Sequence, residues 1–140
     1  MKNSFALAVK AIIIRENRFL VLHRSKKEME KSRLNNNECW DLPGGGVRFF
    51  ETAQNGLMRE IWEETHLKTE IKSIFSCYDV IKNGIHMSIL TYVCAYKEGE
   101  VVLSGEHDAF FWLTLEEMES MKLPRWMVRD FKKALAVCTE

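Results

Sequence analysis

One acidic helical segment places the strongest constraint on how this chain can fold. Residues 52–65 form its clearest helical pattern, and they follow a run of glycines at positions 44–46. Glutamates at spacings i, i+3 and i+4 share one side of this predicted helix. Carboxylates held so close together repel one another unless a cation lies among them. The pattern therefore favours a divalent metal ion beside Glu60, Glu63 and Glu64.

The apolar residues of the same segment indicate which way the acidic stripe faces. Each residue of an α-helix advances by about 100°, so the apolar stripe starts beside the glutamates and continues away from them. Its members are Leu57, Met58, Ile61 and Trp62. The carboxylates are therefore predicted to lie along the edge of the core, which is a position that suits a cleft.

A solvated acidic helix is the simpler interpretation, because most single glutamates are exposed. The joint pattern argues against it. The six fixed positions of this pattern are Gly45, Glu51, Arg59, Glu60, Glu63 and Glu64, and chance would produce them in a chain of this length about once in 10⁵. Within the pattern, Arg59 is predicted to pair with a nearby acid, either Glu63 one turn on or Glu51 at the helix start.

Composition limits the classes of protein that remain. The 140 residues predict a single domain over 1–140 with a real core, and 20 basic residues balance 20 acidic ones. A neutral chain lacks the basic excess that long nucleic acids require. No segment reads as a secretory signal or a membrane span, and the spacing of the four cysteines does not match a zinc finger. We therefore expect a cytoplasmic protein with reduced cysteines.

The rest of the chain alternates strands with helices. Residues 25–37 are interpreted as a loop and 44–46 as a turn. A capping-box spacing starts a short helix at 114–121, and Pro124 opens a final helix with one apolar face. This order predicts an α/β fold with a mixed sheet and helices on both faces. Strands are expected at 5–14, 19–23, 39–42, 70–80, 86–96, 100–103 and 109–113.

The glycine–glutamate pattern resembles the Nudix box. Gly45, five residues, Glu51, seven residues and then the residues at 59–64 match that motif, and the segment 40–47 is similar to the family's approach to it. The match covers about a sixth of the chain and is highly specific. The resemblance implies a MutT-like pyrophosphohydrolase with a Nudix-like α/β/α sandwich around a mixed central sheet.

Two positions differ from the usual family pattern. His66 stands two residues after the last box glutamate, where the family has glycine, and we expect it to take the left-handed conformation at a modest cost in stability. Phe50 replaces a glycine that often precedes the first box glutamate. This second change affects the loop that lies near the substrate.

What the resemblance implies is hydrolysis of the pyrophosphate bond in a nucleoside diphosphate linked to another moiety. The substrate would be a nucleoside triphosphate, including an oxidised one, or a nucleotide sugar such as ADP-ribose. The implied cofactor is Mg²⁺, with Mn²⁺ as the alternative. The implied metal ligands are the Gly44 carbonyl, Glu60, Glu63, Glu64 and Glu106.

The same resemblance assigns catalytic roles. Glu60 is the first choice for the general base, with Glu64 beside it, and Glu51 and Arg59 form a supporting pair. Gly45 is expected to lie against the substrate. Gly46 is expected to do the same, because a backbone without side chains can approach the substrate closely.

Several residues outside the box have both a functional and a structural interpretation. Glu106 is either a further ligand or part of a charged turn, and His107 reads as a loop histidine. Arg24 ends a strand and is predicted to contact phosphate, whereas the other basic residues of its run read as a solvated loop. Trp40 and Phe49 are candidates for stacking on a base, although such aromatics are more often part of the core.

Two other functions are compatible with the same fold. A nucleotide-binding sensor without catalysis is the first, and the intact glutamates argue against it. An isomerase of isoprenyl diphosphates is the second, and no cysteine stands where its catalytic acid would be expected. The partner in the favoured interpretation is a small nucleotide, with no membrane and no long nucleic acid, and the protein is expected to be a monomer or a homodimer.

Overall fold

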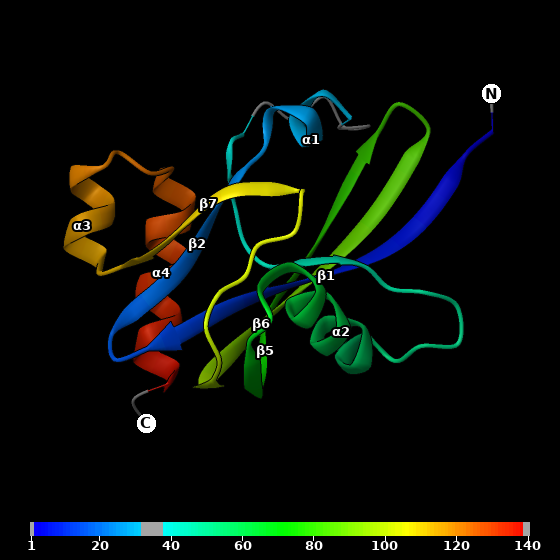
Figure 1. The fold of residues 1–140 in the computed structure, drawn as a ribbon. Coiled ribbons are helices and arrows are strands. Elements are labelled where there is room, and N and C mark those ends of the chain that lie inside the picture. The colour runs from blue at the N-terminus through cyan, green and yellow to red at the C-terminus, as the bar shows by residue number, and fades with distance from the viewer. Residues whose placement is uncertain (1, 32–37, 139–140) are drawn as a thin grey trace.

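One mixed sheet organises the fold (Figure 1). The computed structural model describes residues 2–31 and 38–138, with the backbone alone for residue 138. In this part of the chain, seven strands follow the order β3-β2-β1-β6-β5, with β4 paired to β1 and β7 paired to β2. The strands are β1 (Ser4–Arg15), β2 (Arg18–Arg24), β3 (Trp40–Asp41), β4 (Gly44–Gly46), β5 (Lys68–Lys82), β6 (Ile85–Glu98) and β7 (His107–Leu113).

Helices cover both faces of this sheet. Over the described residues they are α1 (Lys26–Glu30), α2 (Ala53–Thr65), α3 (Leu115–Ser120) and α4 (Arg125–Cys138). Figure 1 shows α2 on one side of the sheet, and α3 and α4 on the other. None of these described helices is long and apolar enough to cross a membrane.

Strand β1 lies at the centre and explains the layering. It pairs in parallel with β6 along residues 4–14, and antiparallel with β2 and β4. Because helices cover both faces, its sequence is apolar almost without alternation. Val9, Ala11 and Ile13 pack in one core with α2, whereas Ile12 and Ile14 pack in a second core with α4. The predicted α/β/α sandwich with a mixed sheet is confirmed.

The ends of α2 follow from local chemistry. Thr52 accepts a hydrogen bond from the Asn55 N–H at 3.1 Å, so it caps the first turn. At the other end, His66 takes the expected left-handed conformation, with φ at 60°. The predicted apolar stripe of α2 was wrong at Trp62, which lies at the edge of the stripe and is 49% exposed. Its ring stacks on His66, with the ring centroids 4.9 Å apart.

The C-terminal helices agree with their sequence signals. Thr114 and Glu117 form the predicted capping box at the start of α3. The apolar face of α4 is buried at Met127, Phe131 and Ala134, and Phe131 stacks on Phe19 with centroids 4.5 Å apart. The sequence also predicts Cys138 on this apolar face, but its side chain lies outside the described residues.

Three local predictions were wrong. The glycines of β4 form a short strand, because their backbone pairs with residues 8–10 of β1. Residues 100–103 form no strand: Val101 and Leu103 pack on the α2 core, and the Val102 N–H donates to the Thr65 carbonyl at 3.0 Å. The predicted loop at 25–37 contains α1, and its part at 32–37 lies outside the described residues.

Phe50 provides a test of backbone strain in the loop between β4 and α2. Its φ is 65° and its side chain is fully exposed. Phe50→Gly should raise the free energy of unfolding by about 0.5–1 kcal/mol, because glycine adopts this conformation without steric cost. Urea denaturation would measure it. The neighbouring Phe49 is equally exposed without a positive φ, so Phe49→Gly should give no gain; an equal gain in both variants would contradict the strain argument.

Candidate active site

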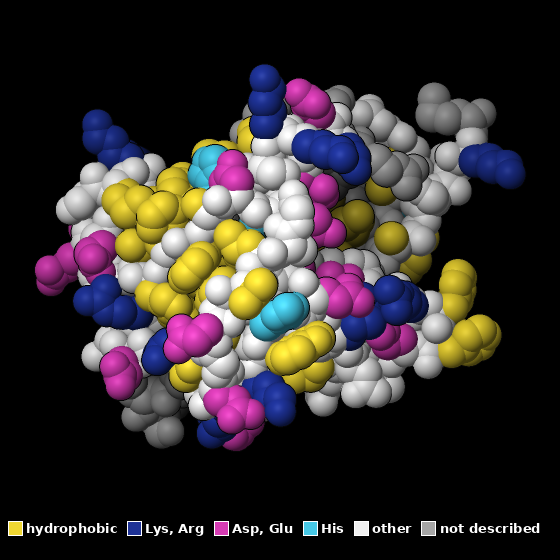
Figure 2. Space-filling view, viewed as in Figure 1, with side chains coloured by type: hydrophobic (Ala, Val, Ile, Leu, Met, Phe, Trp, Pro, Cys, Tyr) yellow, Lys and Arg dark blue, Asp and Glu magenta, His cyan; other side chains and the backbone are white. Residues whose placement is uncertain are grey.

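A large cavity opens beside the glycine strand. Its volume is about 1320 Å³, and its lining includes residues of β1, β3, β4, β5, β6, α2 and α4. Figure 2 shows charged side chains of both signs around a hollow in this face of the molecule. Both predicted substrate glycines, Gly45 and Gly46, line the cavity, as do Arg24 and Trp40.

A polar chain of three residues supports the base of this cavity. The Lys10 Nζ donates to Asp41 Oδ1 at 2.9 Å and to the Leu42 carbonyl at 3.2 Å. On the other side of the carboxylate, His107 Nε2 lies 3.1 Å from Asp41 Oδ2. Burial alone would raise the pKa of Asp41, but Lys10 and His107 hold that pKa well below its usual range. Asp41 is therefore a fixed negative charge.

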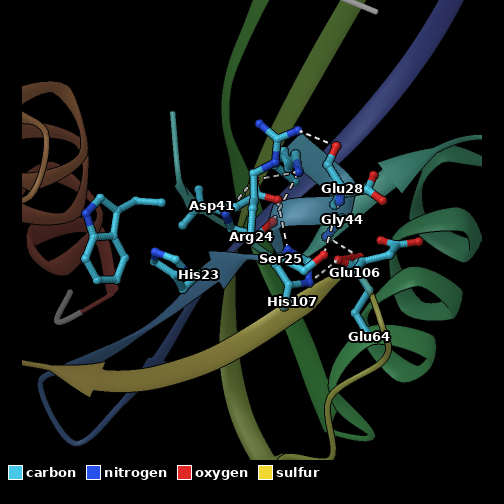
Figure 3. A network of polar contacts seen from close by, with 12 residues as sticks. His23, Arg24, Ser25, Glu28, Asp41, Gly44, Glu64, Glu106 and His107 are labelled. Atoms are coloured by element: carbon cyan, nitrogen blue, oxygen red, sulfur yellow. Dashed lines mark hydrogen bonds and ion pairs between the residues drawn. The ribbon is translucent and has the colours of Figure 1, made fainter. Parts of the chain in front are cut away.

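Glu64 reaches the same place from the last turn of α2 (Figure 3). Its side chain is only 2% exposed, and Oε2 accepts a hydrogen bond from the Gly44 N–H at 3.0 Å. Burial raises the pKa of Glu64 to about 9, although Lys10 and the Gly44 N–H oppose this shift. Its other oxygen, Oε1, is buried and has no hydrogen-bond partner.

The unsatisfied oxygen faces a second unsatisfied atom. His107 is 5% exposed, and its Nδ1 lies 3.6 Å from Glu64 Oε1, which is too long for a hydrogen bond. Glu106 precedes it, and one ligand atom from each of these three residues lies within 4.8 Å of the others. Buried polar atoms without partners are costly, and a cation between these two would satisfy both. These residues therefore fit a divalent metal ion.

Arg59 organises the exposed side of the site. Its Nε and Nη2 donate to the two oxygens of Glu51 at 2.8 and 3.0 Å, which is the predicted pair in bidentate form. Hydrogen bonds from Arg59 lower the pKa of Glu51 to about 2. Its Nη1 also donates to Glu60 Oε1 at 2.9 Å, and its Nη2 to the Gly46 carbonyl at 3.0 Å. One guanidinium thus connects α2 to β4.

The three box glutamates differ in exposure, although Glu60 and Glu63 both accept a hydrogen bond from Arg59 Nη1, at 2.9 and 3.3 Å. Glu60 and Glu64 line the cavity. Glu63 is 48% exposed and pairs with Arg59 at 3.3 Å and with Arg48 at 3.8 Å. Its helical position lies on the solvent side of Glu60, and the nearby guanidinium groups hold it there. Its role as a ligand stays a prediction.

Two of the residues predicted to bind substrate, Arg24 and Trp40, make contacts within the protein. Arg24 donates to the carbonyls of Glu38 at 3.1 Å and Glu28 at 3.4 Å. Trp40 packs against the α4-side core, and its ring meets His23 edge-on with centroids 5.3 Å apart. Phe49 is exposed and is not part of the cavity lining.

The sequence interpretation missed the Lys10–Asp41–His107 chain. A lysine within an otherwise apolar central strand was the available signal, because it requires a buried partner. His107 was assigned to a loop, but it begins β7 opposite Arg24. A register shift next to this pair leaves Asp108 as an extra residue, and Asp108 contacts His23 at 2.7 Å. Such a bulge re-aims side chains near a site, and no local pattern revealed it.

Known proteins share this fold and this motif. A sequence model of the NUDIX domain matches residues 4–135. A MutT-like protein of Streptomyces ambofaciens is 29% identical over 125 residues, which cover 89% of this chain and 73% of that protein. An ADP-ribose pyrophosphatase of Methanocaldococcus jannaschii is 36% identical over 73 residues, which cover 52% of this chain and 39% of that protein.

A solved structure agrees over the full length. The crystal structure of a MutT protein from Methanosarcina mazei Go1 superposes with a TM-score of 0.75 and 30% identity, covering 100% of this chain and 99% of that one. The chain therefore belongs to the Nudix family, as a hydrolase of the Nudix pyrophosphohydrolase class. This family membership confirms the resemblance to the Nudix family that the motif at 45–67 indicated.

The contact between Gly45 and Glu60 can be tested directly. A Cβ added at Gly45 would lie 2.6 Å from the Glu60 carboxyl carbon, whereas one added at Gly46 would meet no atom within 4 Å. Gly45→Ala should displace the Glu60 carboxyl by about 1 Å to restore van der Waals contact, with little change in melting temperature. Gly46→Ala should leave it in place. Crystal structures of the two variants would show this, and an unmoved Glu60 in Gly45→Ala would contradict the described contact.

Proposed function

We propose that the protein hydrolyses the pyrophosphate bond of a nucleoside diphosphate linked to another moiety, with Mg²⁺ as the cofactor. The observation that carries this proposal is the buried Glu64 carboxylate at the head of the large cavity. One of its oxygens has no partner, and Glu60 and Glu106 line the same cavity. Hard carboxylate oxygens that face a space large enough for a phosphorylated ligand are the usual setting for Mg²⁺.

Glu64 and Glu106 would hold the metal, with Glu60 next to them; the Gly44 carbonyl and Glu63 remain predicted ligands. A bound divalent cation neutralises charge on the phosphate oxygens. Glu60 is the proposed general base, because its carboxylate borders the cavity and receives a hydrogen bond from Arg59 at 2.9 Å. That contact orients Glu60 to accept a proton from water.

The Glu51–Arg59 pair would act by positioning. The bidentate contact at 2.8 and 3.0 Å holds the guanidinium, which in turn holds Glu60 and the Gly46 carbonyl. Because Arg59 is ordered by Glu51 before substrate arrives, Glu60 loses little freedom on binding. The pair therefore supports the base without contacting the reacting atoms.

The cavity supports a nucleotide as the substrate. Its volume of about 1320 Å³ exceeds the usual range for small ligands, which is about 300–1,000 Å³. Phe75, Met87 and Ile89 offer apolar surface for a nucleoside, whereas Arg24 and Arg129 offer positive charge for phosphates. The name of one relative, an ADP-ribose pyrophosphatase, supports nucleotide sugars as one class to compare with nucleoside triphosphates.

A hydrolysis screen tests the proposal. Nucleoside triphosphates, nucleotide sugars and dinucleoside polyphosphates would each be incubated with the protein, with and without Mg²⁺. We expect turnover of at least one class, its loss in EDTA and its return when Mg²⁺ is added in excess. Nucleotide binding without any turnover would favour the sensor instead, and turnover that ignores EDTA would exclude the metal.

Substitution of the carboxylates tests the individual roles. Glu60→Gln and Glu64→Gln should each lower kcat by on the order of 10²-fold or more, because glutamine provides neither a base nor an anionic ligand. Glu98→Gln is the control, since Glu98 is exposed and pairs with Lys68 at 3.3 Å. Circular dichroism would check folding. A near-native rate in both Glu60→Gln and Glu64→Gln would contradict the assignment.

A further inference from the structure

We propose that His107 is itself a ligand of the metal, through Nδ1, so that the cation is held by a mixed nitrogen–oxygen set of His107, Glu64 and Glu106. This inference rests on the proposed metal-dependent function and deepens it. The sequence pattern predicted oxygen ligands alone, with His107 as a loop residue. The structure instead buries this side chain beside the carboxylate on which the proposed site depends.

The first argument is the direction of the imidazole ring. Nε2 lies 3.1 Å from Asp41 Oδ2, and Asp41 is fixed as a carboxylate by the Lys10 Nζ at 2.9 Å. A carboxylate only accepts hydrogen bonds, so Nε2 must carry the proton and donate it. Nδ1, the other ring nitrogen, takes no part in this contact, and Figure 3 shows this side of the ring directed at Glu64.

The second argument is that the two atoms facing each other both lack a hydrogen-bond partner. Nδ1 and Glu64 Oε1 are buried and lie 3.6 Å apart, which is too long for a hydrogen bond between them. Two ligands of one cation, each about 2.1 Å from it, lie roughly 3 Å or more apart. A metal ion therefore satisfies both atoms with little movement.

The third argument is the support behind the histidine. Histidines that bind metals almost always donate their other ring N–H to a carboxylate or carbonyl, which fixes the tautomer and orientation. Asp41 of β3 fills that role here, and it is in turn held by Lys10 of β1. Two strands of the sheet thus fix the ring before any metal binds.

A nitrogen ligand changes which metals the site prefers. Imidazole binds Mn²⁺ and later transition metals better than it binds Mg²⁺, which favours oxygen. We therefore expect His107→Gln to weaken Mn²⁺ binding by about 10-fold or more and Mg²⁺ binding by less. Isothermal titration of each metal into the full chain gives both dissociation constants. An equal loss for the two metals would overturn the preference.

Pulsed electron paramagnetic resonance gives the direct test, with Mn²⁺ alone as the probe. In the native protein we expect the hyperfine coupling of a directly bound ¹⁴N, replaced by the ¹⁵N pattern after labelling with ¹⁵N-histidine. The coupling should vanish in His107→Gln and persist in His86→Gln, whose exposed ring contacts Asp79 at 3.3 Å. The labelling experiment needs no variant, so it remains decisive even if His107→Gln does not fold.

The outcomes separate this inference from the proposed function. Bound Mn²⁺ without nitrogen coupling in the native protein would overturn the role of His107, while EDTA-sensitive hydrolysis would still support the metal-dependent enzyme. Absence of Mn²⁺ binding together with EDTA-insensitive hydrolysis would overturn both. Nitrogen coupling that is lost only in His107→Gln would establish the ligand.

Discussion

The hydrogen bond from the Gly44 N–H to the buried Glu64 carboxylate is the contact on which the site depends. It spans 3.0 Å and joins the last turn of α2 to strand β4, which is itself paired with the central strand. Through this bond the helix that bears the acidic residues is fixed to the sheet that bears Lys10 and Asp41. A carboxylate so far from water is costly without partners, so its place among strand backbone, lysine and histidine is a functional arrangement maintained by the fold.

The close approach of helix and strand also explains the glycines. At Gly44, where φ is 150°, an added Cβ would lie 2.0 Å from the Val9 carbonyl oxygen. This oxygen belongs to the backbone of the central strand, so the clash cannot be removed by rotating a side chain. At Gly45 the neighbour is the Glu60 carboxyl, at 2.6 Å. The first glycine is thus required by the sheet and the second by the site. Both meet the need for close packing, whereas the sequence had suggested a turn.

The parts of the fold that the sequence predicted are those that local chemistry determines. The limits of α2, the cap at Thr52, the left-handed His66 and the Arg59–Glu51 contact all arise within one turn or one loop. The exposed position of Glu63 did not follow from helical spacing alone, because its direction also depends on Arg48 and Arg59. His107 was missed because its environment comes from three other elements, distant in sequence, and from a bulge between β2 and β7 that leaves no local signature.

The cavity is lined by two groups of elements that differ in what they contribute. Glu60, Glu64 and Glu106 belong to α2 and to the loop before β7, whereas much of the remaining lining comes from β5, β6 and α4, which lie outside the family motif. Substitutions in β5, β6 and α4 can change the shape and charge of the cavity without touching the hydrogen bonds around Glu64. Evolution can therefore diversify substrate choice on this scaffold while the reaction chemistry stays constant, and related enzymes with the same acidic helix need not share a metabolite.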